Sequence, residues 1–413
     1  MNRSFEENLA LYAKLTVQEG LGLARGQELI VSAEIDQAPL VRLIAAEAYR
    51  AGAKNVEVLW MDPEIVVTRF REGSDEAIQY TANWLIDGVT RAFRENAARL
   101  GILSSDPGLL ASVDPQRVAD SSRAQSLARK EMSDLIVSGH MNWCIVGAAS
   151  PAWARTVFPS LPEEEAVARL WEAIFQTSRV LEPDPIAAWR AHCRNVTARK
   201  DWLNGLRLDA LHFKGPGTDL RVGLVENHRW VGVQSTCKNG ITCSPNIPTE
   251  EIFTMPHRAR VDGTVRSSKP LSVRGQIVDG ITVEFREGLA VDVKADKGLE
   301  TLEKLLSSDE AAKRLGEVAL VPNSGKVGET GVLFYNSLFD ENAASHIAFG
   351  ASYGENLGGY EEMAETERKQ AGANDSIIHV DWMIGSGDMD VDGILGDGST
   401  HAVMRGGEWV QLS

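Results

Sequence analysis

The spacing of apolar residues predicts a strand–helix–strand unit near the start of the chain. Apolar residues close to helical spacing predict a first helix within residues 4–22, which ends at two glycines. ELIVSAEI (28–35) and NVEVLWM (55–61) are predicted strands, and APLVRLIAAEAYRAG (38–52) between them is a predicted helix. A strand, a helix and a strand at this pitch indicate a parallel, Rossmann-like α/β unit.

The turn after the first predicted strand, IDQAPL, contains no glycine. A dinucleotide site needs glycines at this turn, because the backbone N–H groups must come close to the phosphates. A nucleotide-dependent enzyme is therefore an alternative that the sequence disfavours.

The hydrophobic pattern changes near residue 200. Residues 75–200 carry apolar residues at three- and four-residue steps, for example in NWLIDGVTRAFRENAARLG (83–101), and are predicted to be mostly helical. One strand, WCIVGAA (143–149), interrupts them. We therefore expect an N-terminal α/β domain with a helical segment over residues 1–200.

Short strands punctuated by glycine follow from residue 207 to the end. VRGQIVDGITVEFREGLAVDVKA (273–295) is typical of an antiparallel meander, and two helical stretches are predicted at 299–315 and about 340–350. Residues 201–413 are thus expected to form a second, mainly antiparallel β domain.

Composition and charge narrow the class of protein. The chain has 413 residues, of which 43% are hydrophobic and 24% charged, as in globular proteins. The net charge of −16 disfavours a nucleic-acid partner, because displacing phosphate counterions needs a surplus of Lys and Arg. Four cysteines without a C-x-x-C pair predict neither a disulfide framework nor a thiolate metal site. With an acidic N-terminal segment and no apolar run of roughly 18–20 residues, we expect a cytoplasmic protein without a membrane partner.

One strand-like segment, SIIHVDWMIGS, pairs an imidazole with a carboxylate. Strand alternation places His379 and Asp381 on one face, where both could bind one cation or form a structural hydrogen bond. The aspartates that follow, from Asp388 onward, resemble a calcium loop with Gly393 at the sixth position. The twelfth position is Ser399 where a bidentate glutamate is needed, so we interpret this run as a turn whose aspartates accept backbone N–H groups.

Three more segments offer metal ligands. Glu341 and His346 stand five residues apart in LFDENAASHIAFG, Glu250 and Glu251 are adjacent in NIPTEEIFTMP, and Glu317 enters the apolar run LGEVALV. Each has a plain alternative: a helix cap, a solvated pair of acids or a strand-edge glutamate. Together with the His–Asp strand they provide the carboxylates and imidazoles of a two-metal hydrolytic site. For the other histidines a surface or satisfied core position is expected: His140, His192, His212, His228, His257 and His401.

Longer motifs around these residues resemble those of a known family. NIPTEEIFTMPHR, RLGEVALVP, LFDENAASHIAFGASYGEN and HVDWMIGS are similar to segments of the thermophilic metallo-aminopeptidases typified by aminopeptidase T, and the resemblance extends over essentially the whole chain. It implies an α/β N-terminal domain, a β-rich C-terminal domain with two divalent ions (zinc, cobalt or manganese), and a homodimer. It also implies removal of N-terminal residues from peptides, often leucine and other apolar or basic residues.

The resemblance also implies roles for individual residues. Glu317 is the candidate to bridge the two ions, and Tyr353, in GASYGEN, would lie beside them and donate a hydrogen bond to the developing oxyanion. By analogy with other dimetal peptidases, Glu250 is the candidate general base. A dinuclear phosphoesterase and a non-catalytic metal- or peptide-binding protein are the alternatives. The implied metal ligands are Glu251, Glu317, Glu341, His346, His379 and Asp381.

Overall fold

The computed structural model describes residues 3–273 and 276–411, which form two compact units. The first contains residues up to 191 together with 234–248, and the second contains 192–233 and the residues from 249 onward. The division falls inside the long helix α10 (Pro185–Leu206), as does the boundary predicted at 200/201. Segment 234–248, predicted as part of the second domain, belongs to the first unit.

A parallel sheet forms the centre of the first unit. Its strand order is β2-β1-β3-β4-β9, and all its pairs are parallel. The predicted strand–helix–strand unit is confirmed as β1 (Glu28–Glu34), α2 (Ala38–Ala51) and β2 (Asn55–Met61). The remaining strands of this sheet are β3 (Ala98–Leu103), β4 (Trp143–Gly147) and β9 (Asn246–Ile247).

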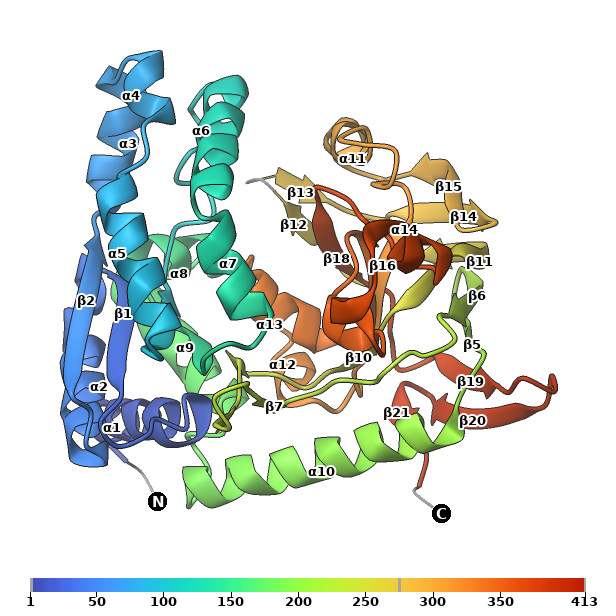
Figure 1. Ribbon diagram of the computed structural model, residues 1–413, viewed down its shortest axis with the longest axis horizontal. Coiled ribbons are helices and arrows are strands. Elements are labelled where there is room, and N and C mark those ends of the chain that lie inside the picture. Colours follow the sequence, from blue (N-terminus) through green and yellow to red (C-terminus); the bar gives the residue numbers. More distant parts are fainter. Residues whose placement is uncertain (1–2, 274–275, 412–413) are drawn as a thin grey trace. The chain divides into compact units, whose positions relative to one another are not determined.

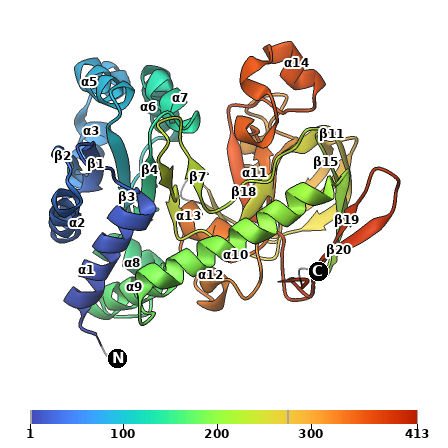
Figure 2. The same cartoon turned by 60° about the horizontal axis from the view of Figure 1, so that its bottom comes forward.

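Helices cover both faces of this sheet. Figure 2 shows α5 and α7 on one side of the strands and α2 and α9 on the other. On the α5 side, Ile30 of β1 packs with Val89 and Phe93. A π-helical turn (Thr16–Gly20) extends α1 and ends at the predicted glycine. The other helices of this unit are α1 (Phe5–Leu15), α3 (Pro63–Glu72), α4 (Asp75–Gln79), α5 (Asn83–Arg94), α6 (Pro115–Ala128), α7 (Lys130–Val137), α8 (Pro151–Val157) and α9 (Glu163–Thr177).

The prediction of a helix over 83–101 was wrong at its end. Helix α5 stops at Arg94, Asn96 has a positive φ of 76°, and Ala98–Leu103 forms the central strand β3. An apolar run that is buried on both faces between parallel strands lacks alternation, so its periodicity alone cannot separate it from a helix.

Antiparallel sheets dominate the second unit, as predicted. The larger has the order β15-β14-β11-β6-β5-β19-β20-β21, whose strands are labelled in Figure 1. The smaller has the order β10-β16-β17-β18. The larger sheet contains β5 (Ala210–Gly215), β6 (Thr218–Leu224), β11 (Pro256–Arg266), β14 (Thr282–Arg286), β15 (Leu289–Lys294), β19 (Asp390–Ile394), β20 (Thr400–Arg405) and β21 (Glu408–Trp409). Two short hairpins are β7 (Ser235–Thr236) with β8 (Thr242–Cys243), in the first unit, and β12 (Leu271–Val273) with β13 (Gln276–Val278), in the second. The predicted single meander over 273–295 was wrong: β13 pairs with β12 in a separate hairpin, and only β14 and β15 pair with each other in the larger sheet. Its residues 274–275 lie outside the described residues.

The smaller sheet consists of β10 (Ile252–Thr254), β16 (Leu315–Leu320), β17 (His346–Gly350) and β18 (His379–Met383). Aromatic rings join it to the larger sheet: Phe349 stacks on Trp382, with ring centroids 5.4 Å apart, and lies 6.0 Å from Phe285 of β14. All three rings are buried, so they contribute apolar contact between the two sheets.

Short helices connect these strands. The first predicted helical stretch is confirmed only in part, as α11 (Leu299–Leu306). The second, at about 340–350, is wrong over most of its length: α13 (Ser337–Asp340) and a 3₁₀ turn (Glu341–Ala343) precede strand β17. The others are α12 (Lys326–Glu329), α14 (Glu365–Gln370) and two 3₁₀ turns (Gly354–Asn356 and Tyr360–Glu362). Among the described residues, no helix is both long and apolar enough to cross a membrane.

Candidate metal centre

Strand register in the smaller sheet places four of the predicted ligands on one face. Glu317 of β16 and Asp381 of β18 both lie opposite Ala348 of β17. Residues directly opposite in antiparallel strands share a face. His346 and Gly350 are two residues away from Ala348 on either side, so His346, and His379 opposite Gly350, belong to the same face.

Small residues beside the ligands keep this face open. Ala348 separates the two carboxylates, Ala319 lies opposite His346, and Gly350 lies opposite His379. Gly350 has a φ of +102°, and a Cβ there would lie 2.0 Å from the carbonyl oxygen of Ile378. A larger residue at this position would therefore push the strand that carries His379 away from its neighbour.

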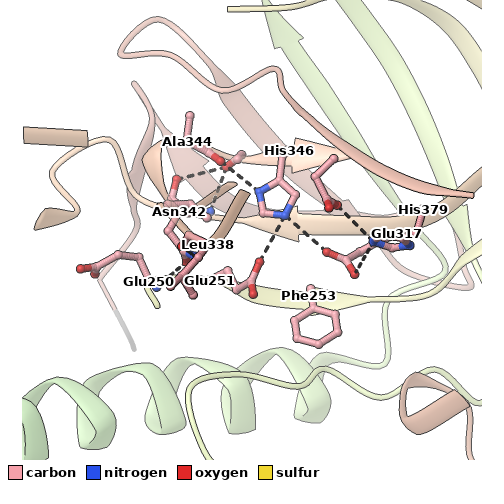
Figure 3. Close-up of polar contacts among 12 residues, drawn as sticks. Glu250, Glu251, Phe253, Glu317, Leu338, Asn342, Ala344, His346 and His379 are labelled. Carbon is pink, nitrogen blue, oxygen red and sulfur yellow. Dashed lines mark hydrogen bonds and ion pairs between the residues drawn. The ribbon is translucent and has the colours of Figure 1, made fainter. Parts of the chain in front are cut away.

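Glu317 lies between two groups of possible ligands (Figure 3). Its Oε1 lies 3.3 Å from Nε2 of His346, and its Oε2 lies 3.7 Å from Nε2 of His379. Nε2 of His346 is also 3.2 Å from Oε2 of Glu251, and Nε2 of His379 is 3.3 Å from Oδ1 of Asp381. Each group has donor atoms within 4.8 Å of one another, and Glu317 belongs to both: Glu251, Glu317 and His346 in one, and Glu317, His379 and Asp381 in the other.

Glu341 is adjacent to this cluster and outside both groups of three. It opens the 3₁₀ turn before β17. Burial, together with the charges of Glu251 and Asp381, raises the pKa of Glu341 well above its usual range. Only nearby carboxylates have this electrostatic effect, so Glu341 adds another acid to the same region.

The acids and imidazoles of the cluster perturb one another strongly. Burial raises the pKa of Glu317 to about 7, and the charge of Asp381 acts in the same direction. Burial alone would lower the pKa of His379, but the carboxylates of Asp381 and Glu317 raise it to about 9. Burial likewise opposes the protonation of His346, and Glu251 and Glu317 raise its pKa well above the ordinary value. The buried carboxylates therefore favour positive charge among them, from protonated imidazoles or from bound cations.

The histidines are held in the orientation that metal ligands need. Nδ1 of His379 donates to the carbonyl oxygen of Ala351 at 2.7 Å, and Nδ1 of His346 donates to that of Ala344 at 3.2 Å. Both Nε2 atoms then face the carboxylates. Oδ1 of Asp381 is buried and forms an ion pair with His379. Such fixed imidazoles and buried acids fit divalent cations with nitrogen and oxygen ligands.

Tyr353 lies beside the cluster, where its ring centroid is 4.6 Å from that of His379. Its ring also meets Phe253 edge to face at 6.2 Å. Burial and the charges of Glu317 and Asp381 raise its pKa, so the hydroxyl keeps its proton. The side chain is 36% exposed, so Tyr353 is at the solvent side of the site.

Glu250 is not brought to the metal ligands. Figure 3 shows the side chain of Glu251 directed at His346 and that of Glu250 directed away from it. This is expected of consecutive side chains on an extended segment, which point in opposite directions. Oε1 of Glu250 accepts the N–H of Lys326 at 3.3 Å, and Oε2 lies 3.9 Å from Nδ1 of His192.

Sequence reasoning missed three neighbours of the site. His192 is satisfied in the core, which is one of its two expected positions, with its Nε2 2.8 Å from the carbonyl oxygen of Thr249; its place beside Glu250 was not predicted. The other two are Asn342, which accepts the backbone N–H of Glu250 at 2.7 Å, and Phe253, whose ring meets that of Tyr353 edge to face. None of them carries a local signal, because each reaches the site through tertiary contacts.

The aspartates after β18 serve the structure of the larger sheet. Asp390 accepts the N–H of Gly406 at 2.8 Å, and Asp392 pairs with Arg405. The predicted support of backbone N–H groups is confirmed for Asp390, whereas Asp392 binds a guanidinium instead. The predicted turn was wrong, because Asp390–Ile394 forms strand β19.

Comparison with known proteins decides the family. Residues 5–409 match the thermophilic metalloprotease family (M29). The chain belongs to this family. It is similar to aminopeptidase T of Thermus thermophilus, with 50% identity over 407 residues, which are 98% of this chain and 99% of that protein. Aminopeptidase AmpS of Bacillus subtilis is 42% identical over 406 residues, with the same coverage of both chains.

A solved structure gives the same answer for the fold. Wild-type AmpT from Thermus thermophilus superposes with a TM-score of 0.94 at 49% identity, covering 99% of this chain and 100% of that one. The α/β plus antiparallel β architecture is thereby confirmed. Membership of M29 also confirms the predicted class of enzyme: a metal-dependent aminopeptidase, which is a hydrolase and an exopeptidase. The phosphoesterase alternative is not favoured.

Proposed function

We propose that this M29 enzyme removes the N-terminal residue of peptides at a site with two divalent ions, zinc, cobalt or manganese. The position of Glu317 carries this proposal, since its two oxygens face two separate ligand groups. A shared carboxylate is the usual bridge of a dinuclear site. The proposed ligands of the two ions are Glu251, Glu317, Glu341, His346, His379 and Asp381.

Charge balance supports two ions. Four ionised carboxylates, Glu251, Glu317, Glu341 and Asp381, carry a formal charge of about −4, which two divalent cations neutralise. One divalent ion would leave about two buried negative charges uncompensated, and each such charge costs several kcal/mol. Burial, and after it the neighbouring negative charges, raises the pKa values of Glu317 and Glu341 in the metal-free protein.

The bound ions would supply an activated water and polarise the scissile carbonyl. The side chains of this chain orient the reactants. Tyr353 holds its proton and lies at the open side of the site, so its hydroxyl can donate a hydrogen bond to the oxygen on which charge develops. In the loaded site the free α-amine of a peptide would bind one ion or pair with a nearby carboxylate, which favours cleavage at the N-terminus.

The general-base role of Glu250 stays a prediction. Its carboxylate lies on the far side of the peptide from Glu251, so the side chain would have to turn to reach the reacting water. Glu250→Gln tests the role, because a base requires most of kcat to be lost while both ions are retained. An unchanged kcat would remove Glu250 from this role.

Metal analysis joined to activity tests the proposed function. Chelator should stop the release of p-nitroaniline from leucyl-p-nitroanilide, and zinc, cobalt or manganese should restore it, with two ions bound per chain. N-acetyl-leucyl-p-nitroanilide, which lacks the free amine, is the matched control and should not be cleaved. Cleavage of the acetylated substrate would refute exopeptidase action, and one ion per fully active chain would refute the dinuclear site.

Three further expectations remain predictions about this chain. A preference for leucine and other apolar or basic N-terminal residues is tested with a panel of aminoacyl-p-nitroanilides. Light scattering tests the homodimer, and cell fractionation tests the cytoplasmic location.

A further inference from the structure

Glu251 lies on the irregular segment directly before strand β10, which begins at Ile252. Residues Thr249, Glu250 and Glu251 are buried, with 4%, 5% and 8% of their surface exposed. Strand pairing starts only afterwards, where Ile252 lies opposite Leu320 of β16. Ladder hydrogen bonds therefore do not fix the direction of the Glu251 side chain, and other contacts must do so.

Asn342 makes one of these contacts. Its Oδ1 accepts the backbone N–H of Glu250 at 2.7 Å, and its Nδ2 donates to the carbonyl oxygen of Leu338 at 3.1 Å. The side chain is fully buried, and the residue directly follows Glu341. One amide therefore ties the segment of Glu251 to the segment of Glu341.

His192 and the carboxylate of Glu250 make the other contacts that hold the segment of Glu251. The Nε2–H of His192 donates to the carbonyl oxygen of Thr249, and its Nδ1 faces Oε2 of Glu250. The other oxygen of that carboxylate accepts the N–H of Lys326. The peptide is thus held at the Thr249 carbonyl, at the Glu250 N–H and at the Glu250 side chain, with Glu251 directed to the opposite side.

We propose that Asn342 and His192 are positioning residues which, together with the side chain of Glu250, hold Glu251 against His346 and so set the affinity of one metal group. The inference rests on the proposed function, in which Glu251 is a ligand. It assigns Glu250 a supporting contact, whichever residue acts as the base. The second group, formed by His379 and Asp381 with Glu317, does not depend on this support.

Metal titration of each variant in competition with a chromogenic chelator tests the inference, because it separates a stronger and a weaker ion. Asn342→Ala and His192→Ala should each weaken one ion about 10- to 100-fold and leave the other within about twofold, as losses of supporting contacts around metal ligands do. His192→Gln, whose amide can still donate to the Thr249 carbonyl, should recover most of the affinity. Asn227→Ala, at an exposed asparagine of the same unit, is the matched control.

Glu250 gives a second pair of variants. Glu250→Ala should weaken the same ion, whereas Glu250→Gln keeps an oxygen for the Lys326 N–H and should retain both ions. Circular dichroism of the metal-free variants checks that each is folded, and a variant that fails is replaced by the milder Asn342→Ser.

The outcomes separate the two proposals. If Glu251→Ala loses one ion while the Asn342 and His192 variants bind both ions normally, the positioning role is refuted and the ligand set stands. If Glu251→Ala itself retains both ions, the proposed ligand set fails. Equal weakening of both ions in the Asn342 and His192 variants would indicate general destabilisation and would also overturn the inference.

Discussion

Replacing Glu317 by glutamine tests the proposed bridge most directly. Glutamine has nearly the same shape and keeps one carbonyl oxygen, so the buried strand β16 should remain folded. The change removes the negative charge of a carboxylate whose two oxygens lie 3.3 Å from His346 Nε2 and 3.7 Å from His379 Nε2. Because these oxygens face different groups, the variant should weaken both ions.

The size of the effect follows from Coulomb's law. One carboxylate oxygen carries about half a negative charge. Its attraction to a divalent cation therefore equals the attraction between one positive and one negative unit charge at the same distance. At the distance of about 2 Å of a carboxylate ligand and an effective dielectric constant of about 20, this is about 8 kcal/mol for each ion. The amide oxygen of glutamine and the burial cost of the carboxylate offset part of this loss. We expect a net loss of about 2–4 kcal/mol per ion, which weakens binding roughly 30- to 1000-fold.

Chelator-competition titration measures both affinities, and kcat is measured at saturating metal. The matched control is Glu303→Gln on α11, where an exposed glutamate should be neutral. A variant in which one ion binds normally and the other is lost would show that Glu317 is a ligand of a single ion. Unchanged affinity for both ions would refute the reasoning from the shared carboxylate.

Three shorter predictions concern stability and catalysis. In metal-free protein, the pKa of Glu317 is raised from 4.5 to about 7, so the side chain stabilises the folded state below pH 4.5 and this stabilisation is lost as pH rises through 7. The Tm of Glu317→Gln in EDTA should therefore rise relative to that of wild type as the pH is raised from 5 to 8. A Tm difference that does not change with pH would contradict this. Tyr353→Phe should lower kcat about 10²-fold with both ions retained, measured with leucyl-p-nitroanilide, and an unchanged kcat would exclude the oxyanion role. Phe349→Ala should lower the free energy of unfolding by about 3–5 kcal/mol in urea titration, because its ring is fully buried against Trp382 and Phe285; a loss below 1 kcal/mol would mean that the cavity collapses.

Sequence patterns predicted those strands whose bounds depend on neighbouring residues in the sequence. β2 (Asn55–Met61) has its predicted bounds and β1 (Glu28–Glu34) differs by one residue, because glycine and alternating apolar residues delimit them. The face shared by His379 and Asp381 also follows from strand alternation alone. By contrast, β3 (Ala98–Leu103) and β17 (His346–Gly350) are buried throughout or nearly so, and such strands lack the alternation that distinguishes them from helices.

The position of segment 234–248 depends on contacts that no local pattern reveals. Strand β9 (Asn246–Ile247) pairs with β4 of the first unit after the chain has already entered the second. A pairing of two residues has almost no sequence signature, so the compositional change near residue 200 could not indicate that the chain returns. The same holds for His192, whose position beside Thr249 and Glu250 depends on how α10 packs.

The resemblance identified the ligand types, and the strand register explains why they can act together. Opposite Glu317 and Asp381 the central strand has Ala348, and opposite His379 it has Gly350. With larger residues there, the same ligands would be held apart by side chains in the space between them. On the other face of the same strands, Ile347, Phe349 and Trp382 are fully buried. The packing on this face thus fixes the pairing register of the strands. That register determines which candidate ligands lie beside Glu317. Substitutions that shift the register should therefore reduce metal binding before they unfold the unit.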